Sequence, residues 1–314
     1  MIEQQPRPKV SVLILAYNHE KYLRETLEGA VNQVTNFPFE IHVHDDASTD
    51  GTVGIIKEFQ ARYPERIKPL FQKENQFSQN IKPLTKFIYP NLKSEYIAFC
   101  EGDDYWTDPY KLNKQVSFLD EHVEYSFCGH DVQMKYEEGM KVKERFYNKP
   151  KEGSFSFTFL EELENHFVAT PTLVARREHV VSAPVSRNLV SADLYMLLYL
   201  LSRGKGYYMA DKMVVKRRNK GGITVNPEYI KKVGRGQFLL WREVLEFTPR
   251  AYRLLVKDKL AQCERQLIKN SASRGPTSLT ALLYSAILHD PFWLLGLSTW
   301  RRGRIWAQAK RGSS

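Results

Sequence analysis

The sequence predicts an α/β fold in which a mostly parallel central sheet is flanked by helices and followed by a helical C-terminal extension. Apolar runs alternate with segments of helical period through the first hundred residues, which is the pattern of strand–helix–strand units. The hydrophobic fraction of 42% and the charged fraction of 26% are those of a globular protein. Beyond about residue 227 only helical patterns remain, so we expect a sheet domain over 1–225 and a helical region over 226–314.

The first unit begins with a strand over 9–17, KVSVLILAY, whose unbroken apolar run is typical of a strand buried on both faces. Leu23, Leu27 and Val31 then recur at helical spacing, with Asn18 as a candidate N-cap. Further strands are predicted over 40–46, 66–71 and 95–100, and a helix with Ile55, Ile56, Phe59 and Tyr63 on one face follows the first of these. Right-handed crossovers join such units, so these strands should be mostly parallel.

The rest of the predicted sheet domain is less regular. A helical pattern covers 108–122, and short strands and loops are expected over 125–175. A strongly apolar helix over 191–206 and a strand over 207–218 complete the domain.

Polar and acidic residues follow three of the predicted strands. The carboxyl ends of parallel strands meet at one edge of a sheet, where α/β proteins bind their ligands. We therefore expect these residues to lie side by side: Ala16, Tyr17 and Asn18 after the first strand, Asp45 and Asp46 after the second, and Glu101, Asp103 and Asp104 after the fourth. This convergence is the strongest functional signal in the sequence.

The acids of the segment EGDDYW point to a metal ion. Three carboxylates within four positions repel one another unless a cation lies among them. Mg²⁺ and Mn²⁺ prefer oxygen ligands and often combine one or two carboxylates with phosphate oxygens. We therefore predict a divalent cation at Asp103 and Asp104, with a nucleoside diphosphate beside it. Tyr17 would lie against the base, and Asp46 would accept hydrogen bonds from the base or ribose. Two alternatives stay open: Asp45 and Asp46 are ordinary turn residues, or Tyr17 is a packing residue.

Three segments in this order carry a family resemblance: VSVLILAYNHEKYLRETLEGAVNQ, HDDASTDGT and YIAFCEGDDYWTDPYKLNKQVSFL. Together they resemble the inverting family-2 glycosyltransferases of the GT-A fold, in particular bacterial polysaccharide and lipopolysaccharide enzymes with an EGDDYW-like block. The resemblance covers about 8–225. It implies a GT-A fold, a nucleotide-sugar donor, a divalent metal, and direct displacement at the anomeric carbon with inversion.

The resemblance also implies roles for residues at the predicted acidic edge. Asp46 matches the acid that contacts uracil or its equivalent, with Asp45 beside it. Asp103 and Asp104 match the metal and ribose acids of the D-x-D motif, and Glu101 takes the place of its first acid. The loop near the nucleotide base is matched by Ala16, Tyr17 and Asn18.

A general base and acceptor contacts are implied in the same way. The family base is an Asp or Glu at the start of a helix after the D-x-D motif, which Asp193 matches. The alternative for Asp193 is a first-turn acid favoured by the helix dipole. In HFVATPTLVARRE, three residues match the acceptor side, with a polar strand end as the alternative: Thr170, Thr172 and Arg176.

The basic segment VVKRRNKGGITV resembles the flexible family segment that orders over the donor diphosphate. Arg218 is its candidate contact with the donor. Asn219 stands where many relatives have a histidine, so we expect no histidine metal ligand there. A solvated basic turn is the alternative.

The positive charge lies mainly near the C-terminus, where residues 249–314 hold twelve Lys and Arg against three Asp and Glu, nine of the net +10. Proline and two polar residues interrupt the apolar stretch 279–300, which argues against a spanning helix. Its tryptophans and the RRGR cluster favour an anionic membrane surface as partner. A hairpin packed on the sheet domain or on another copy in a homo-oligomer is the alternative. No nucleic-acid-binding motif accompanies the charge, so no nucleic-acid partner is expected.

The predicted function is transfer of a sugar from a UDP- or GDP-linked donor to a hydroxyl of a glycan or lipid-linked acceptor in bacterial surface polysaccharide synthesis. One alternative is a metal-dependent nucleotidyltransferase, which the glycine-free first loop AYNHEKYL disfavours. The other is a non-catalytic nucleotide-binding scaffold, which the intact acids at 103, 104 and 193 disfavour. The opening segment MIEQQPRPKV has no apolar signal core, so we expect a cytoplasmic protein, peripheral on the inner face of the cell membrane if its C-terminal region binds lipid.

Overall fold

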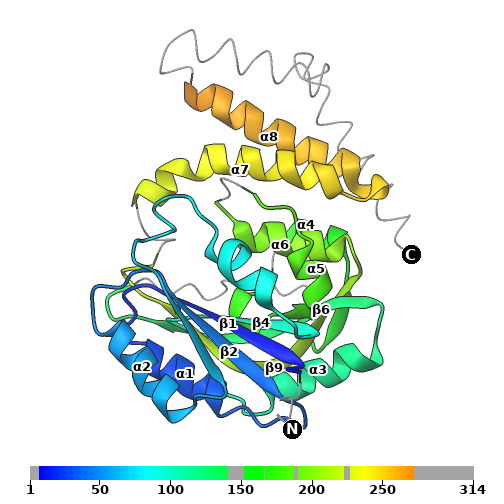
Figure 1. Cartoon of the computed structure of the whole chain (residues 1–314). Helices are drawn as coiled ribbons and strands as arrows, with labels where there is room; N and C mark the ends of the chain where they lie inside the picture. Colours follow the sequence, from blue (N-terminus) through cyan, green and yellow to red (C-terminus); the bar gives the residue numbers. More distant parts are fainter. Residues whose placement is uncertain (1–6, 141–151, 166, 187–189, 223–226, 272–314) are drawn as a thin grey trace. The chain divides into compact units, whose positions relative to one another are not determined.

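The computed structural model describes residues 7–140, 152–165, 167–186, 190–222 and 227–271 (Figure 1). The chain forms two compact units, which divide after Val185, after Ser202 and after Lys220. The first unit contains the sheet, and the second contains only helices among its described elements.

The sheet has nine described strands in the order β3-β2-β1-β4-β8-β6-β9-β5, with β7 paired to β9. Their bounds are β1 Val10–Ala16, β2 Phe39–Asp45, β3 Ile67–Phe71, β4 Tyr96–Glu101, β5 Tyr105–Trp106, β6 Tyr125–Tyr136, β7 Phe155–Phe157, β8 Val174–Arg176 and β9 Lys205–Arg218. The run β3-β2-β1-β4 is parallel, as is the pair β6–β9. β8 is antiparallel to both of its neighbours, and β5 and β7 are antiparallel to β9. The predicted α/β fold is confirmed, and the sheet becomes mixed beyond β4.

Helices α1, α2 and α3 lie along one face of this sheet (Figure 1). The helices of the first unit are α1 Leu23–Val31, α2 Thr52–Arg62, α3 Lys111–Glu121, α4 Phe159–Asn165 and α5 Arg177–Val181, with short turns η1 Leu84–Ile88, η2 Tyr89–Asn91 and η3 Thr170–Thr172. α1 begins at Leu23 and its N-cap is Tyr22, so the prediction of Asn18 as N-cap is wrong.

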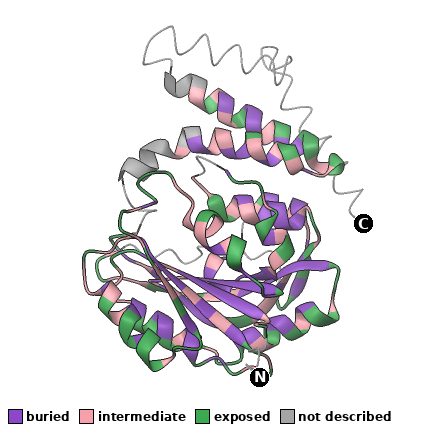
Figure 2. Cartoon of the chain, viewed as in Figure 1, coloured by how far each residue is buried: buried purple, intermediate pink, exposed green. Residues whose placement is uncertain are grey.

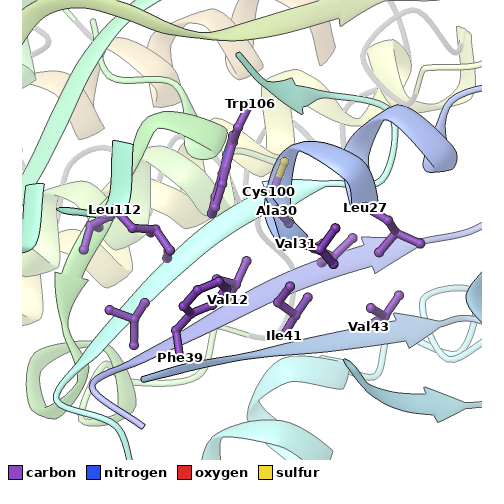
Figure 3. Packing of buried hydrophobic residues seen from close by; sticks show 14 of the residues in the cluster. Val12, Leu27, Ala30, Val31, Phe39, Ile41, Val43, Cys100, Trp106 and Leu112 are labelled. Atoms are coloured by element: carbon purple, nitrogen blue, oxygen red, sulfur yellow. The ribbon is translucent and has the colours of Figure 1, made fainter. Parts of the chain in front are cut away.

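A continuous apolar core holds these helices on the sheet. Leu27 and Val31 of α1 lie over Val12 of β1 and over Ile41 and Val43 of β2 (Figure 3). Each fully buried side chain of this kind contributes about 1.5–3 kcal/mol to folding. β1 and β2 are buried along most of their length, whereas the helices expose their outer sides (Figure 2). The apolar runs of the strands are thus explained by burial on both faces.

Strand register brings the predicted acidic edge together. Ala16 at the end of β1 lies opposite Asp45 of β2, and Leu15 lies opposite Glu101 of β4. β5 follows the acids directly, and its Tyr105 pairs with Val215 of β9. The end of β9 is therefore carried to the same edge as the ends of β1, β2 and β4.

The second unit contains α6 Ala192–Leu201, α7 Pro227–Phe247, η5 Arg250–Tyr252 and α8 Arg253–Ser271. Tyr195 and Tyr199 of α6 meet Phe247 of α7 edge-on, with ring centroids 5.3 and 5.2 Å apart. This helix was expected within the sheet domain over 1–225, whereas in the structure it belongs to the same unit as the C-terminal helices.

Among residues 7–271, with the gaps given above, no helix combines the length and the apolar character needed to cross a membrane. The apolar stretch 279–300 and the RRGR cluster lie outside the described residues. The membrane surface predicted for them stays a prediction.

Candidate functional site

The loops that follow β1 and β2 are tied to each other. The Asn18 N–H donates to Ser48 Oγ at 2.9 Å, and the Thr49 N–H donates to Asn18 Oδ1 at 2.8 Å. Asn18 and Ala47 have φ angles of 54° and 64°, which is unusual for alanine and is found preferentially in functional loops. These contacts fix the backbone around Tyr17, whose side chain is 46% exposed.

Both oxygens of the Asp46 carboxylate accept hydrogen bonds from main-chain amides. The Gln76 N–H donates to Oδ1 at 2.8 Å, and the Phe77 N–H donates to Oδ2 at 3.0 Å. Asp46 is 6% exposed, so little of its carboxylate faces solvent. The neighbouring Asp45 accepts the Ser48 N–H at 3.2 Å, and its Oδ1 is buried with no hydrogen-bond partner in the described part of the chain.

Asp104 is the most deeply buried of the acids that follow β4, at 1% exposure. Its Oδ1 accepts the Arg217 N–H at 2.7 Å, and its Oδ2 lies 3.1 Å from Lys216 Nζ. Burial raises the pKa of the Asp104 carboxyl, and the Lys216 ammonium opposes that rise. Both carboxylate oxygens of Asp104 therefore interact with residues of β9.

Asp103 and Glu101 are more accessible, and each is only half-buried. Asp103 Oδ2 accepts a hydrogen bond from Asn219 Nδ2 at 2.8 Å. Glu101 Oε1 lies 3.8 Å from Lys216 Nζ, and its Oε2 is a buried atom without a hydrogen-bond partner among the described residues. These two carboxylates have acceptor capacity that the described contacts do not use up.

Arg217 joins β9 to both α1 and the acids. Its guanidinium donates to the Asp103 backbone oxygen at 2.7 Å and forms an ion pair with Glu25. It also stacks over the ring of Tyr105, 4.3 Å from the centroid, and over Tyr22 at 5.3 Å. Burial lowers the pKa of Arg217, and the nearby Tyr22 opposes this.

The predicted donor contact, Arg218, is the next residue along β9 and lies opposite Tyr136 of β6. The structure thus places Lys216 and Arg217 at the acids, and sequence reasoning missed Lys216 altogether. Successive side chains of a strand point to opposite faces of the sheet, so neighbouring cations within 214–218 point in opposite directions. The sequence does not determine which of them faces the acids.

His19, which was not predicted as a site residue, lies against Gly102. A Cβ at Gly102 would lie 2.5 Å from His19 Nδ1 and 2.8 Å from the Leu15 backbone oxygen, so only glycine fits there without movement. His19 Nδ1 is buried, and no partner for it lies in the described part of the chain. Burial lowers the pKa of His19, while Asp103, Asp50 and Glu101 act in the opposite direction. In the sequence, the one indication that His19 belongs to the site is its position in the loop that follows the first predicted strand.

Two of the predicted acceptor residues lie near the acidic edge. Thr170 begins η3 and is half-buried, and the adjacent Pro171 oxygen accepts the Trp106 indole N–H at 3.1 Å. Thr172 is fully buried, and its hydroxyl donates to the Ala169 oxygen at 2.7 Å. Thr170 is therefore the more accessible of the two.

Arg176 lies at the opposite edge of the sheet. It pairs with Tyr96 at the start of β4, whereas the acids follow the end of that strand. Its guanidinium donates to the backbone oxygens of Tyr125, Leu119 and His122 at 2.8, 2.7 and 3.1 Å. β8 runs antiparallel to β4, so the end of β8 lies beside the start of β4. We therefore correct the prediction and leave Arg176 out of the candidate site.

Asp193 is exposed in the first turn of α6, in the second unit. Its Oδ1 accepts the Leu194 N–H at 2.9 Å. Its assignment as the general base stays a prediction.

A divalent cation would find its ligands at Asp103 and Glu101. The described residues contain no ready group of three His, Cys, Asp or Glu side chains placed to hold a metal ion. Mg²⁺ and Mn²⁺ need only one or two carboxylates when phosphate oxygens complete their coordination, and the unpartnered Glu101 Oε2 fits this requirement. Both oxygens of Asp104 are already paired, so the more available oxygens are those of Asp103 and Glu101. The assignment of Asp103 and Asp104 as metal ligands stays a prediction.

The sequence model of Glycosyl transferase family 2 matches residues 11–182, more than half of the chain. The uncharacterized protein Rv1520 of Mycobacterium tuberculosis is 36% identical over 214 residues, which are 68% of this chain and 60% of that protein. The chain thus spans less than two thirds of this relative's length.

Two solved structures are similar in fold. TarS of Staphylococcus aureus, in complex with UDP-GlcNAc, has a TM-score of 0.62 at 20% identity, over 96% of this chain and 89% of that one. The mannosyltransferase PcManGT of Pyrobaculum calidifontis, in complex with GDP-Man and Mn²⁺, has a TM-score of 0.53 at 14% identity, over 98% and 87%. At these identities the likeness concerns the fold.

Proposed function

Because the chain belongs to glycosyl transferase family 2, we propose that it moves a sugar from a nucleotide-diphosphate donor to an acceptor hydroxyl with inversion. The observation that carries this proposal is that a half-buried carboxylate, Asp103, and a carboxylate with an unpartnered buried oxygen, Glu101, both follow or end β4 at the edge where β1, β2 and β4 end. This is the edge at which open α/β sheets bind their ligands.

Support for the donor class comes from the site and from its structural neighbours. TarS binds UDP-GlcNAc, and PcManGT binds GDP-Man. A UDP- or GDP-linked sugar is therefore the proposed donor of this chain, with the base near Tyr17 and the diphosphate near Asp103. When bound, Mn²⁺ or Mg²⁺ would stabilise the negative charge of the departing diphosphate.

The cations of β9 would serve the same leaving group. Lys216 Nζ lies between Asp104 and Glu101, at 3.1 and 3.8 Å, and its side chain is 17% exposed. Asp104 fixes the Lys216 ammonium at the edge of the site. A preorganised cation beside a developing negative charge stabilises it without having to move during the reaction.

The proposed general base is Asp193, which would take the proton from the acceptor hydroxyl as that oxygen attacks the anomeric carbon. The acceptor class we propose is a glycan or a lipid-linked glycan of the bacterial surface. TarS, which is 32% identical over 117 residues, is named a poly(ribitol-phosphate) β-N-acetylglucosaminyltransferase. We keep an anionic membrane surface as the proposed partner of the C-terminal region, with self-association through that region as the alternative.

Calorimetry with UDP and GDP, with and without Mn²⁺, tests the donor proposal. We expect one nucleotide to bind at least about tenfold more tightly with the metal, because one or two carboxylates and the phosphates share the cation. Asp103→Asn should remove this metal dependence. Asp211→Asn, which changes an exposed acid of β9 paired with Lys114, should retain it. Equal binding with and without metal in the wild-type protein would contradict the metal site.

A second experiment tests the base. In Asp193→Asn, calorimetric binding of the donor should persist, while release of UDP or GDP in the presence of a lipid-linked glycan extract should fall by about 100-fold or more. Glu178→Gln, an exposed acid on α5, serves as the matched control. Near-normal turnover of the Asp193 variant would remove it as the base.

A further inference from the structure

A cavity of about 260 Å³ lies at the start of β4, at the edge of the sheet opposite the acids. Three arginines, two glutamates and a serine are among the residues that line it: Arg7, Arg176, Arg177, Glu95, Glu178 and Ser94. β4 has 6 residues, so at about 3.3 Å per residue the cavity is roughly 20 Å from the acids that follow this strand. The cavity is therefore separate from the candidate donor site.

Two of the arginines are anchored through Nε alone. Arg177 Nε donates to the Ser94 backbone oxygen at 2.6 Å, and Arg7 Nε donates to the Lys93 backbone oxygen. In the described part of the chain, no hydrogen bond or ion pair engages the terminal nitrogens of either guanidinium. Each guanidinium is thus held in place while its terminal N–H groups stay available to a ligand.

The third arginine, Arg176, is bonded differently. Its guanidinium donates to backbone oxygens of Leu119, His122 and Tyr125, and its Nη1 lies 3.4 Å from the Tyr96 hydroxyl. Arg176 therefore contributes a fixed positive charge to the cavity wall rather than free donors.

Ser94 supplies a second indication of a ligand. The residue is fully buried, and its Oγ has no hydrogen-bond partner among the described residues. A buried hydroxyl without a partner is costly, so such groups are normally paired with protein, water or a bound molecule. This hydroxyl belongs to the same residue that anchors Arg177.

The two glutamates reduce the positive charge of the cavity but do not cancel it. Glu95 and Glu178 are both exposed, and the Glu178 carboxylate lies 3.7 Å from His179 Nε2. Solvent weakens the field of exposed charges. Because three arginines face two glutamates, the lining keeps a net positive charge that favours an anion.

We propose that this cavity binds a phosphate group, carried by a small molecule or by a lipid headgroup. Guanidinium groups bind phosphate oxygens through paired N–H groups, and a further oxygen can accept the Ser94 hydroxyl. One guanidinium is enough to pair both oxygens of a carboxylate, whereas a phosphate has oxygens to share between Arg7 and Arg177. The inference is independent of the proposed sugar transfer.

Calorimetry with inorganic phosphate, in buffer that contains EDTA, tests the site without a metal at the acids. We expect Arg177→Gln and Arg7→Gln each to weaken binding by about tenfold or more, as for hydrogen bonds to charged groups. Arg7 is exposed, so its replacement keeps the test valid even if Arg177→Gln destabilises the fold. Arg62→Gln is the matched control, since Arg62 is an exposed arginine of α2 that does not line the cavity, and it should bind phosphate like the wild-type protein.

Two further variants should change the affinity in opposite directions. Ser94→Ala removes the hydroxyl but keeps the backbone oxygen that holds Arg177, and it should weaken phosphate binding by about threefold or more. Glu95→Gln removes an exposed negative charge and should strengthen binding by about threefold. A purely structural role of these residues would not produce a gain in affinity.

The source of the phosphate is distinguished by two probes. A soluble phosphate ester is indicated if glycerol 3-phosphate competes with phosphate and Arg177→Gln leaves sedimentation with phosphatidylglycerol vesicles unchanged. A lipid headgroup is indicated if Arg177→Gln reduces that sedimentation, with phosphatidylcholine vesicles as the control. Absence of phosphate binding to the wild-type protein at about 10 mM would overturn the inference, as would equal binding by the wild-type protein and both arginine variants. Either result would leave nucleotide binding at the acids intact, so it differs from failure of the proposed function.

Discussion

Two pairs of acids follow the strands on either side of β1, and the protein satisfies them by different means. Asp45 and Asp46 end β2, and their described partners are N–H groups of the nearby loops 48 and 76–77. Asp103 and Asp104 follow β4, and their partners are Lys216, Arg217 and Asn219 at the end of β9. The carboxylates of the first pair are therefore bonded to main-chain amides alone, and those of the second pair to two side chains and one main-chain amide more than a hundred residues away.

This difference separates two functions of a carboxylate at a strand end. Acids bonded to main-chain amides shape a loop, because amides are fixed by the backbone that carries them. Acids bonded to side-chain cations and amides form a charged site, since those partners bring positive charge and polar hydrogens to the edge of the sheet. This difference supports the proposal that the β4 acids, Asp103 above all, take part in the chemistry of the site, whereas the β2 acids shape its loops.

The largest effect we expect comes from breaking the buried pair at β4. Asp104→Ala leaves Lys216 without its closest carboxylate and the Arg217 N–H without an acceptor. We expect the free energy of unfolding to fall by about 3–5 kcal/mol. Asp46→Ala, which leaves two amides near the surface, should cost about 1–3 kcal/mol. Denaturant unfolding of both variants measures the difference, and an equal or reversed ranking would contradict the comparison.

A smaller effect should follow from Arg217→Gln. This change removes the guanidinium that contacts Asp103 and Glu25, and loss of hydrogen bonds involving charged groups should cost about 1.5–3 kcal/mol. Hydrogen exchange should show faster exchange of the amides of 101–106, whereas the amides of 46–50 keep their protection. Arg218→Gln is the matched control and should change neither region. Equal loss of protection at both strand ends would show that the two acid pairs are not independent.

The last effect, which is the smallest when taken per pH unit, is a change in the slope of stability with pH. Lys111 of α3 is completely buried, with its Nζ 2.8 Å from Gln115 Oε1 and 4.2 Å from the centroid of the Trp106 ring. Burial lowers the pKa of Lys111 from 10.5 to about 7. Between these values the unfolded chain binds a proton that the folded chain does not, so stability should rise with pH by up to about 1.4 kcal/mol per pH unit.

Lys111→Met should remove this rise, as measured by denaturant unfolding between pH 7 and 10.5. Lys114→Met, on the same helix, is the control. Asp108 and Asp211 raise the pKa of Lys114, so its replacement should leave the rise in place. An unchanged slope of stability against pH in Lys111→Met would show that a group other than Lys111 binds the proton on unfolding. The result also bears on the comparison of the two acid pairs, because Lys111 lies close to Cys100 of β4, the strand that the second pair follows.

Much of the fold could be predicted from local pattern. β1, β2 and β4 of the parallel run are largely buried, so their apolar sequences identified them, and their shared direction brought the acids to one edge. The mixed half of the sheet was harder, because β8 reverses direction in only three residues. That reversal carried Arg176 to the edge opposite the acids, which no local feature of HFVATPTLVARRE indicates.

Within the site, composition indicated charge, but not which residues would pair. The EGDDYW block predicted a need for cations, and a bound metal was the obvious answer. The structure shows that Lys216 and Arg217 meet part of that need, and only the register between β5 and β9 determines this choice.

The contact between Asp104 and Lys216 joins residues 112 positions apart, and β9 is the last strand of the sheet in chain order. During translation, β1 to β4 leave the ribosome first, and β9, which pairs with the acids at their ends, is synthesised much later. Such a distant contact is also slow to form, because a long loop must close before it can be made. The acidic edge is therefore completed only when β9 joins the sheet, so a chain that stops short of residue 216 would have the acids but not the cations that accompany them.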